Sequence, residues 1–252
     1  MTAMLEVRDL RVSYGKIEAV KGISFSVDTG SVVTLIGGNG AGKTTTLRTL
    51  SGLLKAAAGE ILFEGTRIDG MPAHEIVKRG IAQSPEGRKI FPRMSVRENL
   101  DLGAYLRRDA DVQSDLDRVF DLFPRLKERE KQKAGTMSGG EQQMLAIGRA
   151  IMSRPRLLMI DEASLGLSPK LAQTVFQVVS QINDDGTTVV IVEQNVGVLP
   201  YADQALIMEK GTITFDGREE TTYLTPDEAR ANDLKPCRVC QPESAQTNVT
   251  IR

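Results

Sequence analysis

Apolar residues follow two different spacings along this chain, one typical of strands and the other typical of helices. Within residues 4–28 they occupy alternate positions in two stretches, which predicts a pair of antiparallel strands. Val32 to Ile36 form a short run rich in β-branched residues, as expected of a buried strand. Further strands are predicted at 59–68 (a strand pair), directly after Gly80, at 157–160, at 187–192 and at 205–216 (a hairpin).

A period of three to four residues predicts the helices between these strands. The first helix follows Ile36 closely and carries Leu47, Leu50 and Leu54 on one face. Others are predicted at 72–79, from Ser95 to about Arg108, within 109–130, from Ser138 through Ile151, and from Pro169 to about Asn183. The segment 87–153 is therefore a mostly helical block inserted between the strands of an α/β domain.

Length and charge narrow the possible functions of the chain. Its 252 residues suffice for one large domain, and a formal net charge of −1 gives no global basic field that would attract nucleic acid. No apolar run approaches the roughly 20 residues that a membrane span needs. The N-terminus lacks the layout of a signal peptide. We therefore expect a cytosolic protein that reaches a membrane only through another protein.

The periodic signal fades after Gly217, although a short helix is expected at about 227–232. Residues 4–235 are expected to form one domain, followed by a polar, mobile tail at 236–252. The tail holds both cysteines, Cys237 and Cys240, which form half of a zinc motif at most. The only histidine, His74, is far away in sequence, so we interpret the pair as two incidental thiols.

The strongest chemical signal lies between the strand Val32–Ile36 and the helix after it. Gly37 to Thr44 read GGNGAGKT and match the phosphate-binding pattern G-x-x-x-x-G-K-[ST] in full. Glycines allow the backbone to curl so that N–H groups point at phosphate oxygens, and the helix N-terminus adds its positive dipole end. Lys43 can reach the β- and γ-phosphates, and the Thr44 hydroxyl can bind Mg²⁺. The pattern predicts a site for a nucleoside triphosphate.

Several weaker sequence patterns become candidate nucleotide or metal contacts when they are considered together with this loop. Asp161 and Glu162 end an apolar strand, where one carboxylate could bind Mg²⁺ and the other could polarise a water molecule. Glu86 follows another strand, and Ser138-Gly139-Gly140-Glu141 opens a helix with free N–H groups, a second anion site. Tyr14 could stack on a purine base. Each of these features alone is more often structural: solvated acids, a helix cap and a half-buried strand residue.

Taken together and in this order, the motifs resemble those of ABC-type ATPases over about residues 5–217. The resemblance implies a P-loop NTPase core with an N-terminal antiparallel β-subdomain and an inserted helical subdomain. It implies that two such domains sandwich two ATP molecules, each between one P-loop and the partner's signature motif. Here that motif is Met137 to Glu141, with methionine in the usual leucine place. The implied nucleotide contacts are Tyr14, Gly37, Gly38, Asn39, Gly40, Ala41, Gly42, Lys43, Thr44, Thr45, Ser138, Gly139, Gly140 and Glu141.

The same resemblance implies the catalytic and metal roles. Glu162 would be the general base, assisted by Lys43 and Gln194, and the Mg²⁺ ligands would be Thr44, Asp161 and Glu86. Glu86 and Gln194 stand where most ABC ATPases have a glutamine and a histidine. Three further departures are Gly38 for a commoner Pro or Ala, Ala163 for the usual Pro, and Ser168 for the usual Asp.

The segments PEGRKIFPRMSVRENL, GTMSGGEQQMLAIGRA, DEASLGLSP and VEQN are similar to LivF-type ATPases of branched-chain amino acid importers. That pattern has the same replacements at Glu86 and Gln194, so Gln83 and His74 are not the functional glutamine and histidine. The implied role is ATP hydrolysis coupled to uptake. Alternatives are a urea or amide importer, a lipid exporter, a non-transport ABC protein and a binding-only ATPase.

The implied partners are a second ATPase subunit, identical or paralogous, integral-membrane permease subunits and, indirectly, a solute-binding protein. The chain would lie on the inner face of the cell membrane, held there by the permease. We expect the apolar segment Ile90 to Met94 to dock a short helix of that permease; the alternative is ordinary core packing of Ile90 and Phe91.

Overall fold

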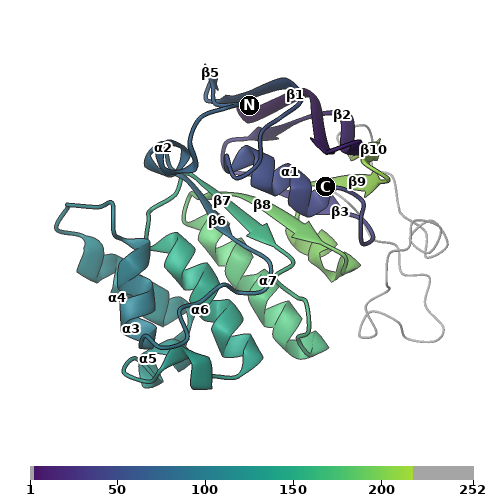
Figure 1. The fold of residues 1–252 in the computed structure, drawn as a ribbon. Coiled ribbons are helices and arrows are strands. Elements are labelled where there is room, and N and C mark those ends of the chain that lie inside the picture. Colours follow the sequence, from purple (N-terminus) through teal and green to yellow (C-terminus); the bar gives the residue numbers. More distant parts are fainter. Residues whose placement is uncertain (1–2, 218–252) are drawn as a thin grey trace, which may run out of the picture.

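The computed structural model describes residues 3–217, which contain two β-sheets (Figure 1). The smaller sheet has four strands in the order β2-β1-β4-β5, and its neighbouring strands are antiparallel. It confirms the strand pairs predicted at 4–28 and 59–68. The bounds are β1 Ala3–Tyr14, β2 Ile17–Asp28, β4 Ala58–Phe63 and β5 Thr66–Arg67.

The larger sheet has six strands in the order β10-β9-β3-β8-β7-β6. All neighbours in it are parallel except β9 and β10. Parallel strands bring their carboxyl ends to one edge, so the loops that follow β3, β7 and β8 lie together there. The bounds are β3 Val32–Ile36, β6 Ile81–Ser84, β7 Leu157–Asp161, β8 Thr188–Glu193, β9 Gln204–Glu209 and β10 Thr212–Asp216.

The helices divide into two groups around this sheet. In Figure 1, α3, α4 and α5 gather beside α6, while α1 lies near β1 and β2 on the other side of the sheet. The bounds are α1 Lys43–Leu50, α2 Ala73–Lys78, α3 Val96–Gly103, α4 Val112–Leu122, α5 Pro124–Glu128, α6 Gly139–Ile151 and α7 Pro169–Asp184, with 3₁₀ turns at Ala134–Thr136 and Val196–Tyr201. Between β6 and β7, where the sequence predicts a helical block at 87–153, the named elements are all helical. None of the helices within residues 3–217 is long and apolar enough to cross a bilayer.

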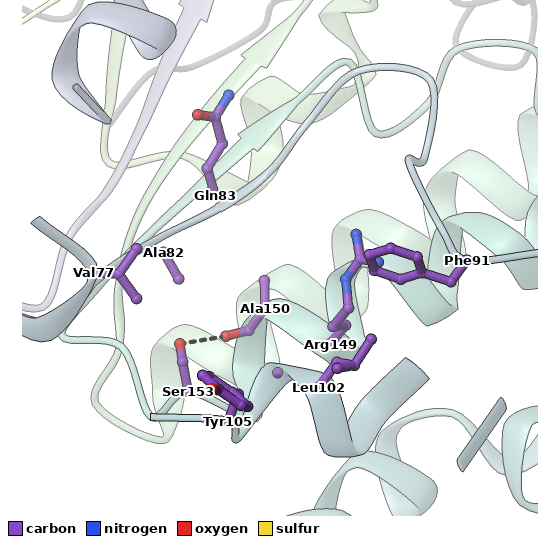
Figure 2. Close-up of a pocket in the computed structure, with 10 residues that line it drawn as sticks. Val77, Ala82, Gln83, Phe91, Leu102, Tyr105, Arg149, Ala150 and Ser153 are labelled. Carbon is purple, nitrogen blue, oxygen red and sulfur yellow. Dashed lines mark hydrogen bonds between the residues drawn. The ribbon is translucent and has the colours of Figure 1, made fainter. Parts of the chain in front are cut away.

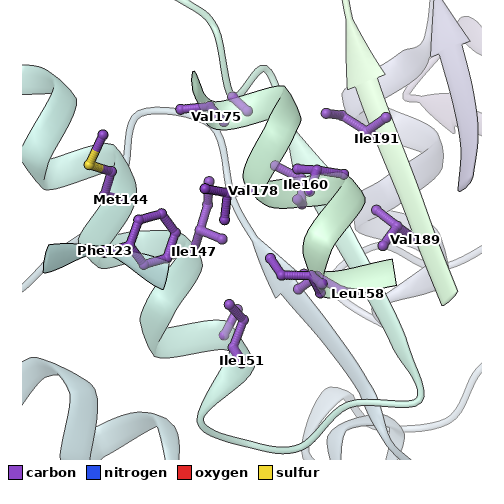
Figure 3. Packing of buried hydrophobic residues seen from close by; sticks show 14 of the residues in the cluster. Phe123, Met144, Ile147, Ile151, Leu158, Ile160, Val175, Val178, Val189 and Ile191 are labelled. Carbon is purple, nitrogen blue, oxygen red and sulfur yellow. The ribbon is translucent and has the colours of Figure 1, made fainter. Parts of the chain in front are cut away.

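Both faces of the larger sheet are buried, which explains its continuous apolar strands. Along β7, Leu158 and Ile160 contribute to a core with α6 and α7, whereas Leu157 and Met159 contribute to a second core with α1 and the smaller sheet. Figure 3 shows the first of these cores, where Leu158 and Ile160 face side chains of α6 and α7 such as Ile147.

Two predicted helix ends were wrong. The first helix ends at Leu50, so Leu54 lies outside it; Gly52, at φ 72°, provides the left-handed residue that commonly ends a helix. The helix that begins after Ser95 ends at Gly103 rather than near Arg108. The segment 109–130, predicted as helical, contains two helices, because Phe123 leaves the helical region (φ −131°, ψ 73°) before Pro124, and proline disfavours that region in the residue before it.

The predictions for the C-terminal segment cannot be compared with this fold. The helix at 227–232, the tail at 236–252, the pair Cys237 and Cys240, and the end of the domain at 235 lie outside the described residues.

Candidate nucleotide-binding and catalytic site

The loop between β3 and α1 has the backbone geometry of a phosphate cradle. Gly42, the N-cap of α1, has φ 103°, and no side chain caps this helix, so its first N–H groups are free for an anion. A Cβ at Gly37 would lie 2.3 Å from the carbonyl oxygen of Met208, so only glycine fits there. Lys43 is 4 % exposed, and its Nζ donates to Gly37 O at 2.8 Å and Gly38 O at 3.0 Å.

Asp161, at the end of β7, faces the P-loop helix. The Thr44 hydroxyl donates to its Oδ1 at 3.0 Å, while its Oδ2 is buried without a hydrogen-bond partner. Burial, together with the charges of Glu162 and Glu86, raises the pKa of Asp161 to about 6. A divalent cation would relieve this electrostatic strain, and hard oxygen donors suit Mg²⁺.

Within residues 3–217 no three His, Cys, Asp or Glu side chains are grouped as a complete metal site. A cation here would need further ligands, such as phosphate oxygens and water, as Mg²⁺ sites in nucleotide-binding proteins commonly have. The orphaned Asp161 oxygen and the adjacent Thr44 hydroxyl therefore fit the predicted cofactor.

Glu162 lies at the centre of three converging loops. Its carboxylate Oε1 is 3.5 Å from Lys43 Nζ and accepts a hydrogen bond from Gln194 Nε2 at 2.7 Å. Gln194 also donates to Asn39 Oδ1 at 2.7 Å. The backbone of Glu162 has φ 50°, unusual for a residue with a side chain, and strain of this kind is concentrated at functional sites. The structure thus brings together Lys43, Asn39, Glu162 and Gln194, which are distant in sequence.

One buried carboxyl group near this site was missed by the sequence analysis. Glu193, the last residue of β8, is 1 % exposed and accepts hydrogen bonds from Ser164 N at 2.9 Å and Ser164 Oγ at 2.7 Å. Burial, as the largest cause, raises its pKa to about 7, and nearby Glu162 acts in the same direction. The available signal was a charged residue that closes an otherwise apolar strand.

Two other predicted residues lie near the P-loop. The ring of Tyr14 is half exposed, and its hydroxyl lies 3.5 Å from Thr45 Oγ1, beside the start of α1. Glu86 is exposed, and its charge acts on Asp161. By contrast, His74 is an exposed residue of α2 that lies 3.2 Å from Glu75.

The segment Ser138 to Glu141 begins α6 in the helical block, separate from the P-loop (Figure 1). The Ser138 N–H donates to Glu141 Oε2 at 2.9 Å, and Glu141 Oε1 pairs with Arg129 at 2.9 Å. No hydrogen bond or ion pair among residues 3–217 joins this segment to Gly37–Thr45. The two predicted anion sites are therefore apart within one chain.

A largely apolar groove of about 480 Å³ opens beside the helical block (Figure 2). Phe91 and Tyr105, which line it, are 49 % and 69 % exposed, whereas Ile90 packs against the core. Arg149 lies 5.4 Å from the centre of the Phe91 ring and donates to Lys89 O at 2.8 Å. Gln83 also lines the groove and takes no part in the carboxylate cluster.

Comparisons with known proteins agree with this geometry. The family model described as "ABC transporter" matches residues 20–165. The chain is 50% identical over 213 residues to the high-affinity branched-chain amino acid transport ATP-binding protein BraG of Pseudomonas aeruginosa, covering 84% of this chain and 91% of BraG. It is 35% identical to the probable branched-chain amino acid transport ATP-binding protein LivF of Archaeoglobus fulgidus, covering 85% of this chain and 92% of LivF.

Solved structures show the same fold. The ADP conformation of MJ1267, an ATP-binding cassette of an ABC transporter, superposes with a TM-score of 0.78 at 28% identity, over 87% of this chain and 92% of MJ1267. The dimeric cassette MJ0796 superposes with a TM-score of 0.79 at 22% identity, over 87% of this chain and 100% of MJ0796.

Proposed function

This chain belongs to the ABC transporter family, as one of its ATP-hydrolysing subunits, and from that premise we propose that it drives uptake of branched-chain amino acids through a separate membrane permease. The observation that carries the catalytic part is the convergence of Lys43, Glu162 and Gln194 at the carboxyl ends of three parallel strands. A lysine for phosphate charge, a carboxylate for water and an amide to orient that carboxylate are the groups that phosphoryl transfer to water requires.

Each side chain then has a distinct task. Lys43, now hydrogen-bonded to the carbonyl groups of Gly37 and Gly38, would turn to the β- and γ-phosphates. Glu162 would orient the attacking water and accept its proton. Gln194 cannot take up a proton as histidine can, so it would act by positioning alone. Mg²⁺, held by Thr44 and Asp161 with Glu86 nearby, would neutralise phosphate charge.

The site would be completed by a second ATPase subunit, identical or paralogous. Support comes from the separation between the P-loop and Ser138–Glu141, which no hydrogen bond or ion pair joins within residues 3–217. The solved MJ0796 cassette is dimeric. In this arrangement Ser138 and Gly140 would bind the γ-phosphate held by the partner's P-loop.

The groove beside Phe91 would receive a short helix of the permease. Exposed aromatic residues such as Phe91 and Tyr105 are typical anchors at protein interfaces. Docking here would hold the chain at the cytoplasmic face of the cell membrane. Crosslinking from Arg93 to the permease in the assembled transporter tests this contact, and its absence there would contradict the docking proposal.

The proposed solute rests on the names of BraG and LivF, since an ATPase subunit does not touch the solute. The decisive experiment reconstitutes the chain with its permease and solute-binding protein in liposomes. We expect ATP turnover to rise with leucine-loaded binding protein and leucine to accumulate. Stimulation by urea or amides alone would favour the alternative importer, and nucleotide binding without any turnover would favour a binding-only role.

A further inference from the structure

Three consecutive residues at the end of β8 hold the segment that carries Glu162. The carbonyl oxygen of Val192 accepts from Glu162 N at 2.9 Å, and the Gln194 side chain donates to the Glu162 carboxylate at 2.7 Å. Between them, the Glu193 carboxylate accepts from both the N–H and the hydroxyl of Ser164. The catalytic segment is therefore tied to this strand end at the backbone of Glu162, at its carboxylate and two residues later at Ser164.

The contact between the Glu193 carboxylate and Ser164 has no direct role in the proposed ATP hydrolysis. This carboxyl group is 1 % exposed and aims away from solvent, and burying such a group is unfavourable unless its oxygens are hydrogen-bonded. Ser164 supplies two of the carboxylate's donors, and the backbone of Asn195 also contributes a hydrogen bond, so much of the compensation depends on the position of Ser164. A displacement of Ser164 would remove two hydrogen bonds from a buried carboxylate, which is costly, so the contact holds Ser164 firmly in place.

The Glu193–Ser164 contact restrains a strained part of the backbone. Glu162 has φ 50°, a conformation that residues with side chains disfavour, and Ala163, which follows it, lacks the ring that would restrict φ. The backbone would relax unless it were held on both sides. Val192 holds the N-terminal side and Glu193, through Ser164, holds the C-terminal side.

We propose that Glu193 is a positioning residue for ATP hydrolysis, which acts through Ser164 to keep the Glu162 carboxylate in line with Gln194 and Lys43. The inference rests on the proposed role of Glu162 as the base. Glu193 contacts the P-loop only through its backbone carbonyl, which accepts from Gly37 N at 3.3 Å and is kept in every side-chain variant, so loss of the side chain affects the chemical step rather than nucleotide binding.

The experiment compares Glu193→Ala, Glu193→Gln and Ser164→Ala with the wild-type chain in the assembled transporter. We expect Glu193→Ala to lower kcat about 10- to 100-fold, as loss of an outer-sphere orienting group typically does, with KM for ATP within about twofold. Glu193→Gln should retain more activity, because an amide can accept from Ser164 N and donate to Ser164 Oγ. Ser164→Ala should lower kcat several-fold in the wild-type chain. In the Glu193→Ala background it should cause no further loss, because the two residues share one contact.

Thr188→Val is the matched control. Thr188 lies at the other end of β8, is fully buried and accepts a hydrogen bond from Gly30 N at 2.9 Å, so its loss costs stability without touching the catalytic segment. Thermal unfolding of every variant separates stability from turnover. If Glu193→Ala fails to fold, Glu193→Gln and Ser164→Ala decide through kcat and KM.

The proposal is overturned if the Glu193 and Ser164 variants keep the kcat of Thr188→Val, or if KM rises in step with the loss of kcat. Glu162→Gln separates this outcome from failure of the proposed function. An inactive Glu162→Gln with a fully active Glu193→Ala removes only the positioning role, whereas an active Glu162→Gln removes the assignment of the base itself.

Discussion

Gln194 Nε2 donates to Glu162 Oε1 at 2.7 Å, and the same nitrogen donates to Asn39 Oδ1 at 2.7 Å. One amide thus joins the loops that follow β3, β7 and β8. Because an amide nitrogen only donates, the carboxylate is held as an acceptor, ready to take a proton from water.

Glu162→Gln should lower ATP turnover by about 10²- to 10⁴-fold, the usual contribution of a general base. Nucleotide affinity should change little, since Lys43 and the P-loop backbone remain. Single-turnover kinetics together with binding of a fluorescent ATP analogue measure both quantities. Rapid hydrolysis by a variant that binds ATP normally would show that another group activates the water.

Thr44→Val should remove the gain in nucleotide affinity that Mg²⁺ provides. Its hydroxyl contacts Asp161 at 3.0 Å, and valine keeps the shape without the oxygen ligand. We expect the ratio of affinities with Mg²⁺ and with EDTA to fall about 10- to 100-fold. Thr49→Val, on the same helix, is the control, because its hydroxyl donates only to Thr45 O. An unchanged ratio in Thr44→Val would exclude Thr44 as a ligand.

Glu193 should make the stability of the protein depend on pH. Its pKa is raised from 4.5 to about 7 in the folded chain, so between these values the folded state binds more protons than the unfolded state. Stability should therefore fall as pH rises from about 4.5 to 7, by on the order of 3 kcal/mol for this group. Glu193→Gln lacks this contribution.

Urea unfolding at pH 5 and pH 8 measures the difference between the wild type and Glu193→Gln. Glu162 is the other carboxylate that acts on Glu193, and both chains retain it. The wild type should lose more stability between the two pH values than Glu193→Gln does. Parallel pH profiles for the two chains would mean that Glu193 keeps an ordinary pKa.

Some of this architecture could be predicted from sequence because it depends on local patterns. The run from Val32 to Ile36, the glycine spacing after it and the capping box at Ser138 each identify an element from a few neighbouring residues. The helix that ends at Leu50 instead of Leu54 shows where such patterns fail: Gly52 fits its position only as a left-handed residue, which apolar spacing does not reveal.

The remaining features depend on contacts between residues that are distant in sequence. Glu193 and Ser164 meet because β7 and β8 are adjacent in the sheet, and strand order cannot be obtained from periodicity. The exposure of Phe91 beside the partly buried Ile90 likewise depends on how the loop packs against α6. Core packing thus applies to Ile90, whereas docking of a permease helix at Phe91 stays a prediction.

The groove can be tested with substitutions that leave the nucleotide site intact. Phe91→Asp and Tyr105→Asp place charges in the apolar surface, so each should weaken the permease contact by about 2 kcal/mol or more, as for an interface hot spot. Transport and permease-stimulated turnover should fall, with basal ATPase unchanged. Leu53→Asp is the control, an exposed apolar residue (58 %) outside the groove. Equal loss in all three variants would argue against a specific docking site.

The shared nucleotide site predicts complementation between two inactive chains. Lys43→Ala inactivates the P-loop of a chain, and Ser138→Arg obstructs the helix N-terminus that begins α6. Each variant alone should form dimers with two defective sites. In a mixed dimer, one site combines both defects, whereas the other combines the intact P-loop of one chain with the intact Ser138 segment of its partner. If half of the dimers are mixed and each has one working site, turnover should recover to about a quarter of the wild-type value.

Mixing wild type with the Lys43→Ala, Ser138→Arg double variant calibrates the assay, since no intact site can then form across the mixed interface. A mixture as inactive as its components would show that each chain hydrolyses ATP with its own residues alone.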